Sequence, residues 1–446
     1  MQDLKKSNYL SIVTAVSLSI GLFLHNETEV EASAPDLAAE AAILVDAETG
    51  QVLYSENEDV ILPPASMTKI MTEYLVNEAE ANGEISWDDE VQLSEKTLQM
   101  SQDYDLSNVP LREGETYTAQ ELYEAMAIYS ANGATIALAE HVAGSESEFV
   151  DRMNKKAEEL GMEEYEFVNS TGLNNASMNG LHPEGTEADA ENMMSAEATA
   201  ILTFHLLNEY PDVLDTASIT EKTFKENSAN VLMENWNWML PGSLEEHLDY
   251  EGVDGLKTGY TELAGNAFTG TAERNGTRYI SVVMRTGSRM ARFEETAKLL
   301  DYGFEDFSEA EVINEGEVFD EASAFPVIKG KEDTVSASAG ESLSLLLEGG
   351  ETEGITPSVS INEDMLNDEG ELEAPLEAGT EIGTVTLEGG SGQEYLLDEA
   401  ASAQAVPLVL EEDVEKAGWF ALTTRSIGGF FGNMWENASN FVKGLF

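Results

Sequence analysis

The hydrophobic pattern of this 446-residue chain changes character near Phe307, and that change most constrains its fold. Before it, apolar residues recur with helical spacing in the segments 67–81, 118–130, 134–143, 147–160, 195–209 and 291–302. Strand-like runs lie on either side, at 41–46 and 48–54 around Gly50, and at 267–272 and 279–284 around the hairpin signal Asn275-Gly276. The pattern predicts one large α+β or three-layer domain over residues 35–306.

After Phe307 the apolar residues alternate in short runs, at 342–347, 358–361 and 382–387. Glycine pairs such as Gly349-Gly350 and Gly389-Gly390 separate these runs. The pattern predicts a small β-sandwich or barrel over residues 307–408. It contains no group of residues to which we would assign chemistry, so a spacer or stalk is the simplest role.

The first 34 residues have the pattern of a secretory signal peptide. Lys5 and Lys6 precede an apolar run over 9–24, and the small-residue exit 30–34 follows. An uncleaved N-terminal anchor is the alternative, but the small-residue exit favours removal. We therefore expect the mature protein to be exported.

The last segment, 411–446, has an apolar stripe at helical spacing and mostly polar residues off that stripe. From Lys416 onward it carries three cations and one anion. It lacks the run of about twenty apolar residues that a membrane-spanning helix needs. We expect an amphipathic helix lying on the outer face of the cytoplasmic membrane. A helix docked on the β domain, or an oligomer contact, is the alternative.

Charge excludes several classes of partner. The chain has 86 acidic and 22 basic residues, a formal charge of −64, which would repel nucleic acids. Because 42% of the residues are hydrophobic, the acidity indicates a carboxylate-covered folded surface and a salty environment. Cysteine is absent, and the five histidines show no metal-ligand spacing, so we expect neither disulfides nor a metal or other cofactor.

The acidic composition predicts that folding requires salt, because salt screens the repulsion between surface carboxylates. We expect the melting temperature to rise between about 0.1 M and 2 M NaCl, a range over which the Debye length falls several-fold. Thermal unfolding followed by circular dichroism checks this, and an unchanged melting temperature would refute it.

Ser66 and Lys69 form the first candidate for chemistry. They stand three residues apart at the start of an apolar helical pattern, so both side chains would lie on one face of the helix. A lysine can take a serine proton only if burial or a second cation lowers its pKa. Spacing alone is weak evidence, since such a pair is usually a solvated helix face.

Three later groups are worth weighing with this pair. Ser130-Ala131-Asn132 falls between two predicted helices, where a hydroxyl and an amide could face a cleft. The segment 253–261 contains Lys257-Thr258-Gly259, an edge strand whose glycines would allow a substrate to approach closely; an ion pair of Lys257 with Asp254 is the alternative. The segment 288–293 adds Arg292 and Arg289, and a surface ion pair is the simpler interpretation of Arg289.

The order of these groups is more specific than any one of them. S-x-x-K and K-T-G each occur once, and a Ser-x-Asn lies between them, as in the penicillin-recognising serine enzymes. From about residue 38 to the C-terminus, including 425–431, the chain resembles the low-molecular-mass penicillin-binding proteins. These are serine-type D-Ala-D-Ala carboxypeptidases, and the resemblance is strongest to the vegetative Gram-positive form.

The resemblance implies an antiparallel sheet with helices on both sides, and a mechanism that removes the terminal D-alanine of peptidoglycan stem peptides. Ser66 would be the nucleophile and Lys69, its pKa lowered by Lys257, the general base. Ser130 and Asn132 would relay a proton to the leaving D-alanine and orient the substrate.

The remaining implied roles concern charge. The N–H groups of Ser66 and Tyr260, which follows Gly259, would stabilise the oxyanion. Thr258 and Arg292 would bind the terminal carboxylate. β-Lactams would acylate Ser66 and act as inhibitors.

Two rivals stay open on the sequence alone. A class A β-lactamase shares the three motifs but needs a glutamate before K-T-G, whereas the only E-x-x-L-N string, Glu363 to Asn367, follows it. A catalytically inactive wall-binding protein is the other, although the presence of all the polar motif residues argues against it.

Overall fold

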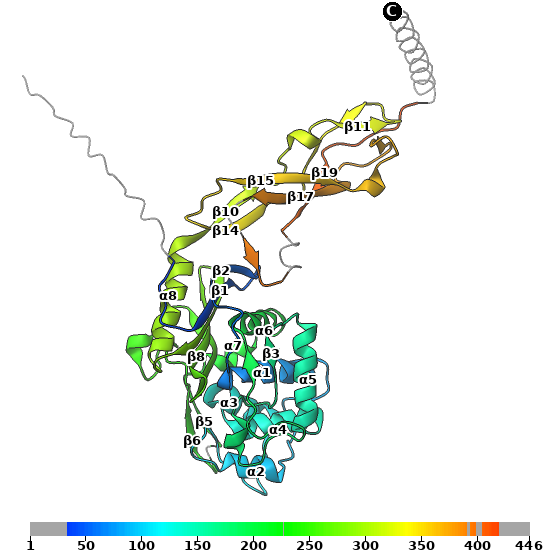
Figure 1. The fold of residues 1–446 in the computed structure, drawn as a ribbon. Helices are drawn as coiled ribbons and strands as arrows, with labels where there is room; N and C mark the ends of the chain where they lie inside the picture. The colour runs from blue at the N-terminus through cyan, green and yellow to red at the C-terminus, as the bar shows by residue number, and fades with distance from the viewer. Residues whose placement is uncertain (1–33, 226, 390–392, 398–403, 419–446) are drawn as a thin grey trace, which may run out of the picture. The chain divides into compact units, whose positions relative to one another are not determined.

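The computed structural model describes residues 34–225, 227–389, 393–397 and 404–418 (Figure 1). The predicted signal peptide, apart from residue 34, and the predicted C-terminal helix from residue 419 onward lie outside these ranges. Within them, no helix combines the length and the apolar character needed to cross a membrane.

A six-stranded antiparallel sheet forms the centre of the first part of the chain. Its order is β18 (Glu394–Tyr395), β2 (Gln51–Glu56), β1 (Ala41–Asp46), β9 (Thr277–Thr286), β8 (Gly265–Arg274) and β7 (Val253–Thr261). Both predicted hairpins, β1–β2 and β8–β9, are confirmed. Asn275 and Gly276 both have positive φ, 55° and 92°, as a tight turn between twisted strands requires. The K-T-G segment lies on β7, an edge strand.

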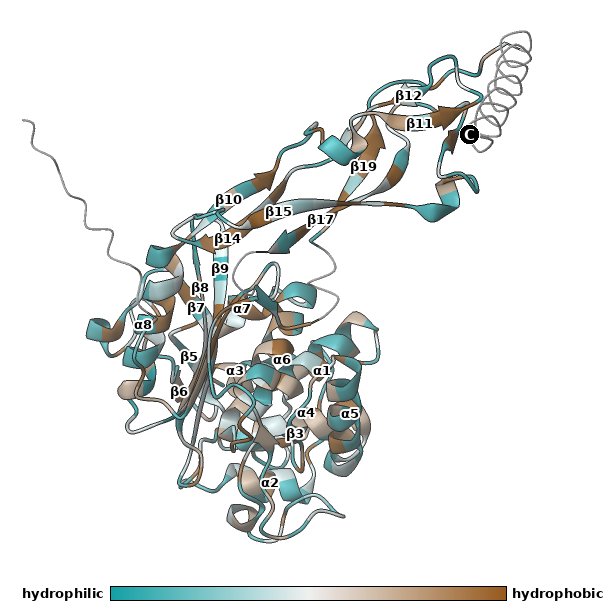
Figure 2. Ribbon diagram, turned by 45° about the horizontal axis from the view of Figure 1, so that its top comes forward, coloured by the Kyte–Doolittle hydropathy of each residue, from teal (hydrophilic) through white to brown (hydrophobic). Residues whose placement is uncertain are grey.

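Helices cover both faces of this sheet, as predicted (Figure 2). Alternate residues of β1 divide between two cores: Ile43 and Val45 face the main group of helices, whereas Ala42 and Leu44 face α8 (Ala291–Asp306). This division follows from the two-residue period of a strand.

The main group consists of helices whose ends follow capping signals in the sequence. It comprises α1 (Lys69–Ala81), α2 (Glu95–Ser101), α3 (Ala119–Tyr129), α4 (Asn132–Ala143), α5 (Glu146–Glu159), α6 (Ala196–Glu209) and α7 (Val213–Ala217). Thr118 and Glu121 form a capping box that starts α3. The predicted segment 67–81 begins instead with a 3-10 turn, η1 (Ala65–Thr68), before α1. Helices α2 and α7 were not predicted because they are too short for a hydrophobic period to emerge.

Two small hairpins complete this part of the chain. They are formed by β3 (Tyr165–Glu166) with β4 (Met193–Met194), and by β5 (Glu221–Phe224) with β6 (Val231–Glu234).

Apart from β18, which joins the central sheet, the described chain after Phe307 forms an all-β region with its own hydrophobic core, as predicted. One sheet pairs β10 (Phe307–Ile313) with β14 (Leu343–Glu348). A second contains β12 (Thr334–Val335), β11 (Phe325–Ile328) and β16 (Leu372–Glu373), and a third contains β13 (Ala337–Ala339), β19 (Val406–Leu410), β17 (Glu381–Gly389) and β15 (Ile355–Ile361). The described residues here contain no α-helix, only short 3-10 turns.

Candidate active site

Ser66 lies in the 3-10 turn that leads into α1, and its backbone surroundings are tight. The preceding residue, Ala65, has φ +49°, a conformation that costs energy for a residue with a side chain. Gly172 packs directly against this turn: a Cβ added to it would stand 1.8 Å from the Ala65 carbonyl oxygen. The turn that presents Ser66 is therefore held by the loop around Gly172.

Lys69, one turn later, is 1% exposed and makes three hydrogen bonds through its amine. The Nζ atom lies 3.1 Å from Ser66 Oγ, 2.8 Å from Asn132 Oδ1 and 2.7 Å from the Thr171 carbonyl oxygen. None of these acceptors is a carboxylate. A buried ammonium without a counter-ion is costly, so burial lowers the pKa of Lys69 well below its ordinary value, and the charge of Lys257 lowers it further.

Ser130 and Asn132 lie where α3 ends and α4 begins. Ser130 closes α3 in the left-handed conformation, with φ 59°, and Asn132 is the first residue of α4. Asn132 is held from both sides, since it accepts from Lys69 and its Nδ2 donates to the Ser107 carbonyl. Ser130 Oγ is buried and has no hydrogen-bond partner among the described residues. It remains available to a ligand.

Strand β7 packs against the Ser66 turn at Gly259. A Cβ at this position would stand 2.5 Å from the Pro64 carbonyl oxygen, so only glycine lets the strand approach so closely. Thr258 and Tyr260, on either side, line the same cleft as Ser66. The glycine therefore brings the strand next to the serine.

Lys257, a residue of this same strand, is buried. Burial lowers its pKa to about 7, with the Glu73 carboxylate opposing that shift and the Arg292 charge reinforcing it. Burial in turn raises the pKa of Glu73 to about 7, opposed by the hydrogen bond from the Tyr123 hydroxyl at 2.6 Å. The alternative pairing of Lys257 with Asp254 is wrong, because Arg278 binds both oxygens of Asp254.

Arg292 reaches the cleft from the first turn of α8. It is 3% exposed, and its Nη1 donates to the Gly259 carbonyl at 3.3 Å. Burial, followed by the nearby charge of Arg289, lowers its pKa to about 9, so it keeps its charge at neutral pH. Its buried Nε lacks a hydrogen-bond partner within the described part of the chain.

The expected surface ion pair of Arg289 is wrong for the residues that the structure describes. Its guanidinium lies over the rings of Trp236 and Tyr260 instead, 5.7 Å from each centroid. The sequence favoured an ion pair because acidic residues are abundant, but the partner of an exposed arginine depends on tertiary neighbours.

These groups surround one cleft of about 410 Å³. It is lined by Ser66, Tyr104, Asp105, Leu106, Ser107, Tyr129, Ser130, Asn132, Leu173, Trp236, Thr258, Tyr260, Arg289 and Arg292. Four parts of this lining were not predicted from the sequence: the loop 104–107, Tyr129, Leu173 and Trp236. No spacing signal joins these residues, because the fold brings them together from separate segments.

A hydrogen-bond network that was not predicted from the sequence holds the carbonyl of Thr171 against Lys69. Asn169 Oδ1 accepts from the N–H groups of Thr171 and Gly172 and from the Thr171 hydroxyl. The neighbouring Ser170 donates both its N–H and its hydroxyl to Glu146, a buried carboxylate at the start of α5.

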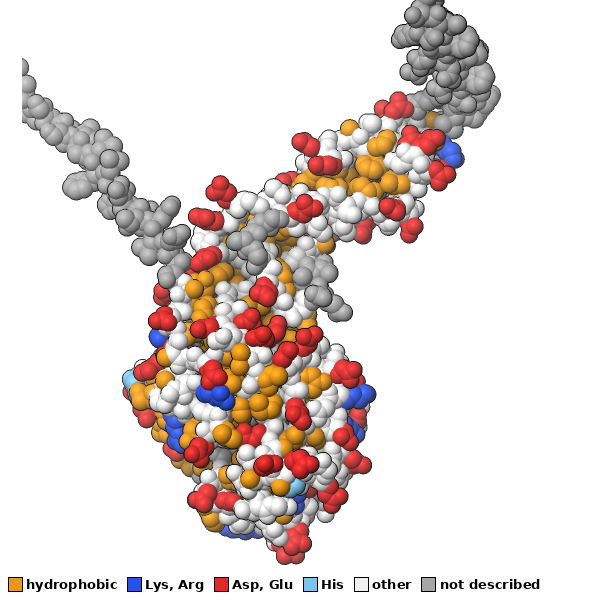
Figure 3. Space-filling view, viewed as in Figure 1, with side chains coloured by type: hydrophobic (Ala, Val, Ile, Leu, Met, Phe, Trp, Pro, Cys, Tyr) orange, Lys and Arg blue, Asp and Glu red, His pale blue; other side chains and the backbone are white. Residues whose placement is uncertain are grey.

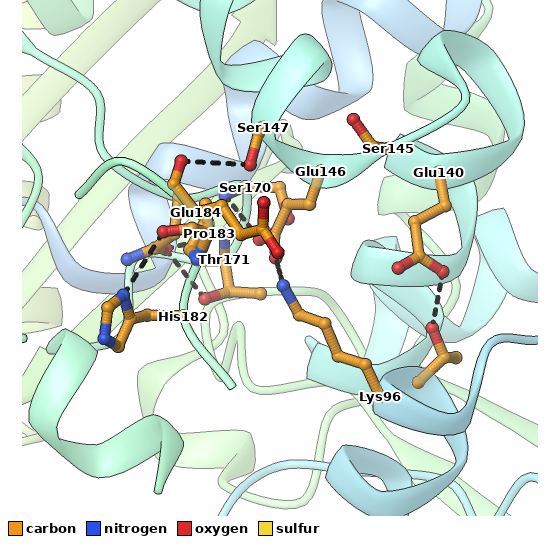
Figure 4. A network of polar contacts seen from close by, with 12 residues as sticks. Lys96, Glu140, Ser145, Glu146, Ser147, Ser170, Thr171, His182, Pro183 and Glu184 are labelled. Carbon is orange, nitrogen blue, oxygen red and sulfur yellow. Dashed lines mark hydrogen bonds and ion pairs between the residues drawn. The ribbon is translucent and has the colours of Figure 1, made fainter. Parts of the chain in front are cut away.

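Lys96 forms an ion pair with that same Glu146 carboxylate (Figure 4). Glu146 is thus the fixed point from which the loop 169–172 is positioned. The cluster of turn-forming residues at 169–172 is the one sequence signal that could have drawn attention to this loop.

Carboxylates are spread over the molecular face seen in Figure 3, with few lysines and arginines among them. Most described lysines and arginines have a carboxylate within ion-pair distance. Those without one among the described residues are Lys69, Lys257, Arg274, Arg289, Arg292 and Lys416. Arg289 and Arg292 line the cleft, whereas Lys69 and Lys257 are buried. The two arginines therefore keep positive charge available at the cleft of an acidic protein.

The only acidic residue among those that line the cleft is Asp105; no glutamate does so in the described chain. Glu363, the glutamate of the E-x-x-L-N string, belongs to a 3-10 turn in the β region. The arrangement thus offers no glutamate beside Ser66 to position a water molecule.

Comparisons with known proteins agree with these motifs. Residues 28–288 match the D-alanyl-D-alanine carboxypeptidase family, peptidase S11, and residues 307–416 match the penicillin-binding protein 5 C-terminal domain. D-alanyl-D-alanine carboxypeptidase DacF of Bacillus subtilis is 32% identical over 392 residues, covering 87% of this chain and 89% of that protein. DacC of Escherichia coli is 30% identical and covers 96% of each chain.

Solved structures agree as well. The chain is similar to a peptidoglycan synthesis regulatory factor, PBP3, from Streptococcus pneumoniae, with TM-score 0.69, 37% identity, and coverage of 85% of this chain and 100% of that one. It is also similar to ampicillin-bound penicillin-binding protein D2 from Listeria monocytogenes, with TM-score 0.50, 33% identity, and coverage of 61% and 99%. The predicted family resemblance is confirmed: the chain belongs to the peptidase S11 family of D-alanyl-D-alanine carboxypeptidases, enzymes of peptidoglycan processing.

Proposed function

We propose that this carboxypeptidase releases the terminal D-alanine of peptidoglycan stem pentapeptides through an acyl-enzyme on Ser66. The observation that carries the proposal is the set of three hydrogen bonds made by Lys69. A neutral amine has two hydrogens and one lone pair. The Asn132 amide oxygen and the Thr171 carbonyl can accept the two hydrogens, which leaves the lone pair for the Ser66 hydroxyl. Lys69 is then a general base aimed at the nucleophile.

In the acylation step, Ser66 Oγ attacks the carbonyl carbon between the two D-alanines while its proton passes to Lys69. The negative oxygen of the tetrahedral intermediate binds to the N–H groups of Ser66 and Tyr260, a placement supported by the close packing of Gly259 on the Ser66 turn. Ser130, whose hydroxyl is free of partners in the described chain, relays a proton to the leaving nitrogen. The C–N bond breaks, D-alanine leaves, and water then hydrolyses the ester.

The terminal carboxylate of the substrate binds Thr258 and Arg292, and the buried Lys257, next to Thr258 in β7, supplies further positive charge. The unpartnered, buried Nε of Arg292 supports this assignment, because a buried donor without an acceptor is costly unless a ligand supplies one. Asn132 orients the substrate. Thr258, Arg292 and Lys257 together therefore favour a substrate that ends in a free carboxylate.

A β-lactam presents a carboxylate and a reactive amide to the same groups. The ampicillin-bound form of the Listeria relative supports β-lactam binding by this chain. We therefore propose that β-lactams acylate Ser66 and are released slowly, since no glutamate among the described lining residues is placed to activate a deacylating water.

The remaining proposals concern the placement of the enzyme. Residues 1–34 would direct export, residues 35–306 would form the catalytic domain, and residues 307–408 would be a β spacer. Residues 411–446 would lie on the outer face of the cytoplasmic membrane. Sedimentation with lipid vesicles, with and without residues 411–446, would test this anchor, and undiminished sedimentation of the truncated chain would contradict it.

The Ser66 acyl-enzyme predicts a lasting covalent adduct with benzylpenicillin. We expect the intact mass of the protein to increase by the mass of one drug molecule, and the Ser66→Ala variant to show no increase. The wild-type protein should also release D-alanine from an N-acylated Lys-D-Ala-D-Ala peptide, and the variant should not.

Two other results of that experiment would be informative. An unmodified protein with intact drug would indicate a binding protein without catalysis. An unmodified protein with consumed drug would indicate a β-lactamase.

The pKa values of the two lysines predict a bell-shaped pH dependence of kcat/KM. Activity should rise as Lys69 loses its proton and becomes a base, a loss that burial and the charge of Lys257 shift well below the ordinary lysine range. Activity should fall as pH passes about 7, where Lys257 loses the charge that attracts the carboxylate.

The Lys257→Arg variant separates the two limbs, because a guanidinium keeps its charge to higher pH than an amine does. In this variant the fall of kcat/KM on the alkaline side should move to higher pH. On the acid side kcat/KM should still rise with pH. An alkaline limb that stays in place would contradict the assignment to Lys257.

A further inference from the structure

The Arg289 side chain is held at the cleft by contacts with aromatic rings. Its guanidinium carbon lies 5.7 Å from the ring centroids of both Trp236 and Tyr260. Trp236 is itself fixed, because it stacks on Tyr129 at 6.0 Å and its Nε1 donates to the Tyr129 carbonyl at 3.2 Å. All four residues line the cleft that contains Ser66. Aromatic faces attract and orient a guanidinium, so the arginine is held there in advance of any ligand.

Arg289 has no carboxylate within ion-pair distance among the described residues, although the chain is strongly acidic. It also lies close enough to Arg292 for the two positive charges to interact. Like charges at this range repel each other unless an anion binds between or beside them. The unpartnered Nε of the buried Arg292 points to the same kind of ligand.

We propose that Arg289 is a specificity-determining residue that, beside Arg292, receives the terminal carboxylate of the leaving residue and selects substrates ending in a free carboxylate. This inference rests on the proposed function, because it takes Thr258 and Arg292 as the carboxylate site. The two arginines divide the task. Arg292 is buried and forms the inner contact with the carboxylate. Arg289 is exposed at the cleft and contacts the same carboxylate only when the leaving residue is the last of the peptide.

The proposal predicts a difference between two matched substrates. One is an N-acylated Lys-D-Ala-D-Ala peptide with a free carboxylate, and the other is the same peptide with a C-terminal carboxamide. The wild-type enzyme should prefer the free acid. In the Arg289→Gln variant we expect the acid-to-amide ratio of kcat/KM to fall about three- to tenfold, mainly through KM, as suits an ion pair at a partly exposed site.

Two further variants separate recognition from folding. Trp236→Leu keeps the guanidinium but removes one ring that holds it, so the ratio should fall in the same direction by a smaller factor. Arg274→Gln is the matched control, because Arg274 also lies over two rings, Tyr250 and Phe304, but outside the lining of the cleft. It removes the same charge from the protein and should leave the ratio unchanged.

The outcomes can be told apart. An unchanged ratio in Arg289→Gln, or an equal loss on both substrates, would overturn the role of Arg289 while Ser66 still forms its benzylpenicillin adduct. A wild-type protein that forms no adduct and releases no D-alanine would instead overturn the function on which the inference rests. A selective loss on the free acid, absent in Arg274→Gln, would support the proposal.

Discussion

The burial of one lysine amine without a carboxylate is the constraint on which the rest of the site depends. Lys69 is 1% exposed and is surrounded by a hydroxyl, an amide oxygen and a carbonyl, none of which can neutralise a full positive charge. Such an environment favours the neutral amine, which is the form that can take the proton of Ser66. The supporting elements, from the Gly172 contact to the Glu146–Lys96 ion pair behind Ser170, keep that environment in place.

In so acidic a protein, the positive charge of the cleft distinguishes it from the rest of the surface. Outside the cleft, nearly all described lysines and arginines are neutralised by neighbouring carboxylates. Arg289 and Arg292, which line it, have no carboxylate within ion-pair distance in the described chain, and Asp105 is the one acidic residue among its lining groups. A substrate that ends in a carboxylate therefore meets a local field opposite in sign to that of the whole molecule. Lys257, whose charge is partly balanced by the Glu73 carboxylate, lowers the pKa of Lys69 and so links positive charge near the cleft to catalysis as well.

Sequence reasoning succeeded where chemistry is encoded locally. Asn275-Gly276 predicted a hairpin because the turn needs positive φ, and the spacing of Ser66 and Lys69 put both on one face of a helix entry. It failed where contacts between residues far apart in the sequence determine the structure. The carbonyl of Thr171 reaches Lys69 across 102 residues, and a backbone carbonyl leaves no mark in a sequence. Strand β18 joins the central sheet beside β2 although more than three hundred residues separate them in the chain. Arg289 was expected in an ion pair, and only the fold reveals the rings on which it lies.

The protonation state of Lys69 is the quantity that tests this account most directly. It can be measured by NMR titration of protein labelled at the lysine side-chain nitrogens, with the Lys69 signal assigned by its absence in Lys69→Arg. The account predicts that this signal titrates well below the ordinary lysine pKa, and that it moves back upward in Lys257→Met, where the neighbouring charge is removed. A Lys69 amine that stays protonated up to the ordinary lysine range in the wild-type protein would contradict the role of Lys69 as general base.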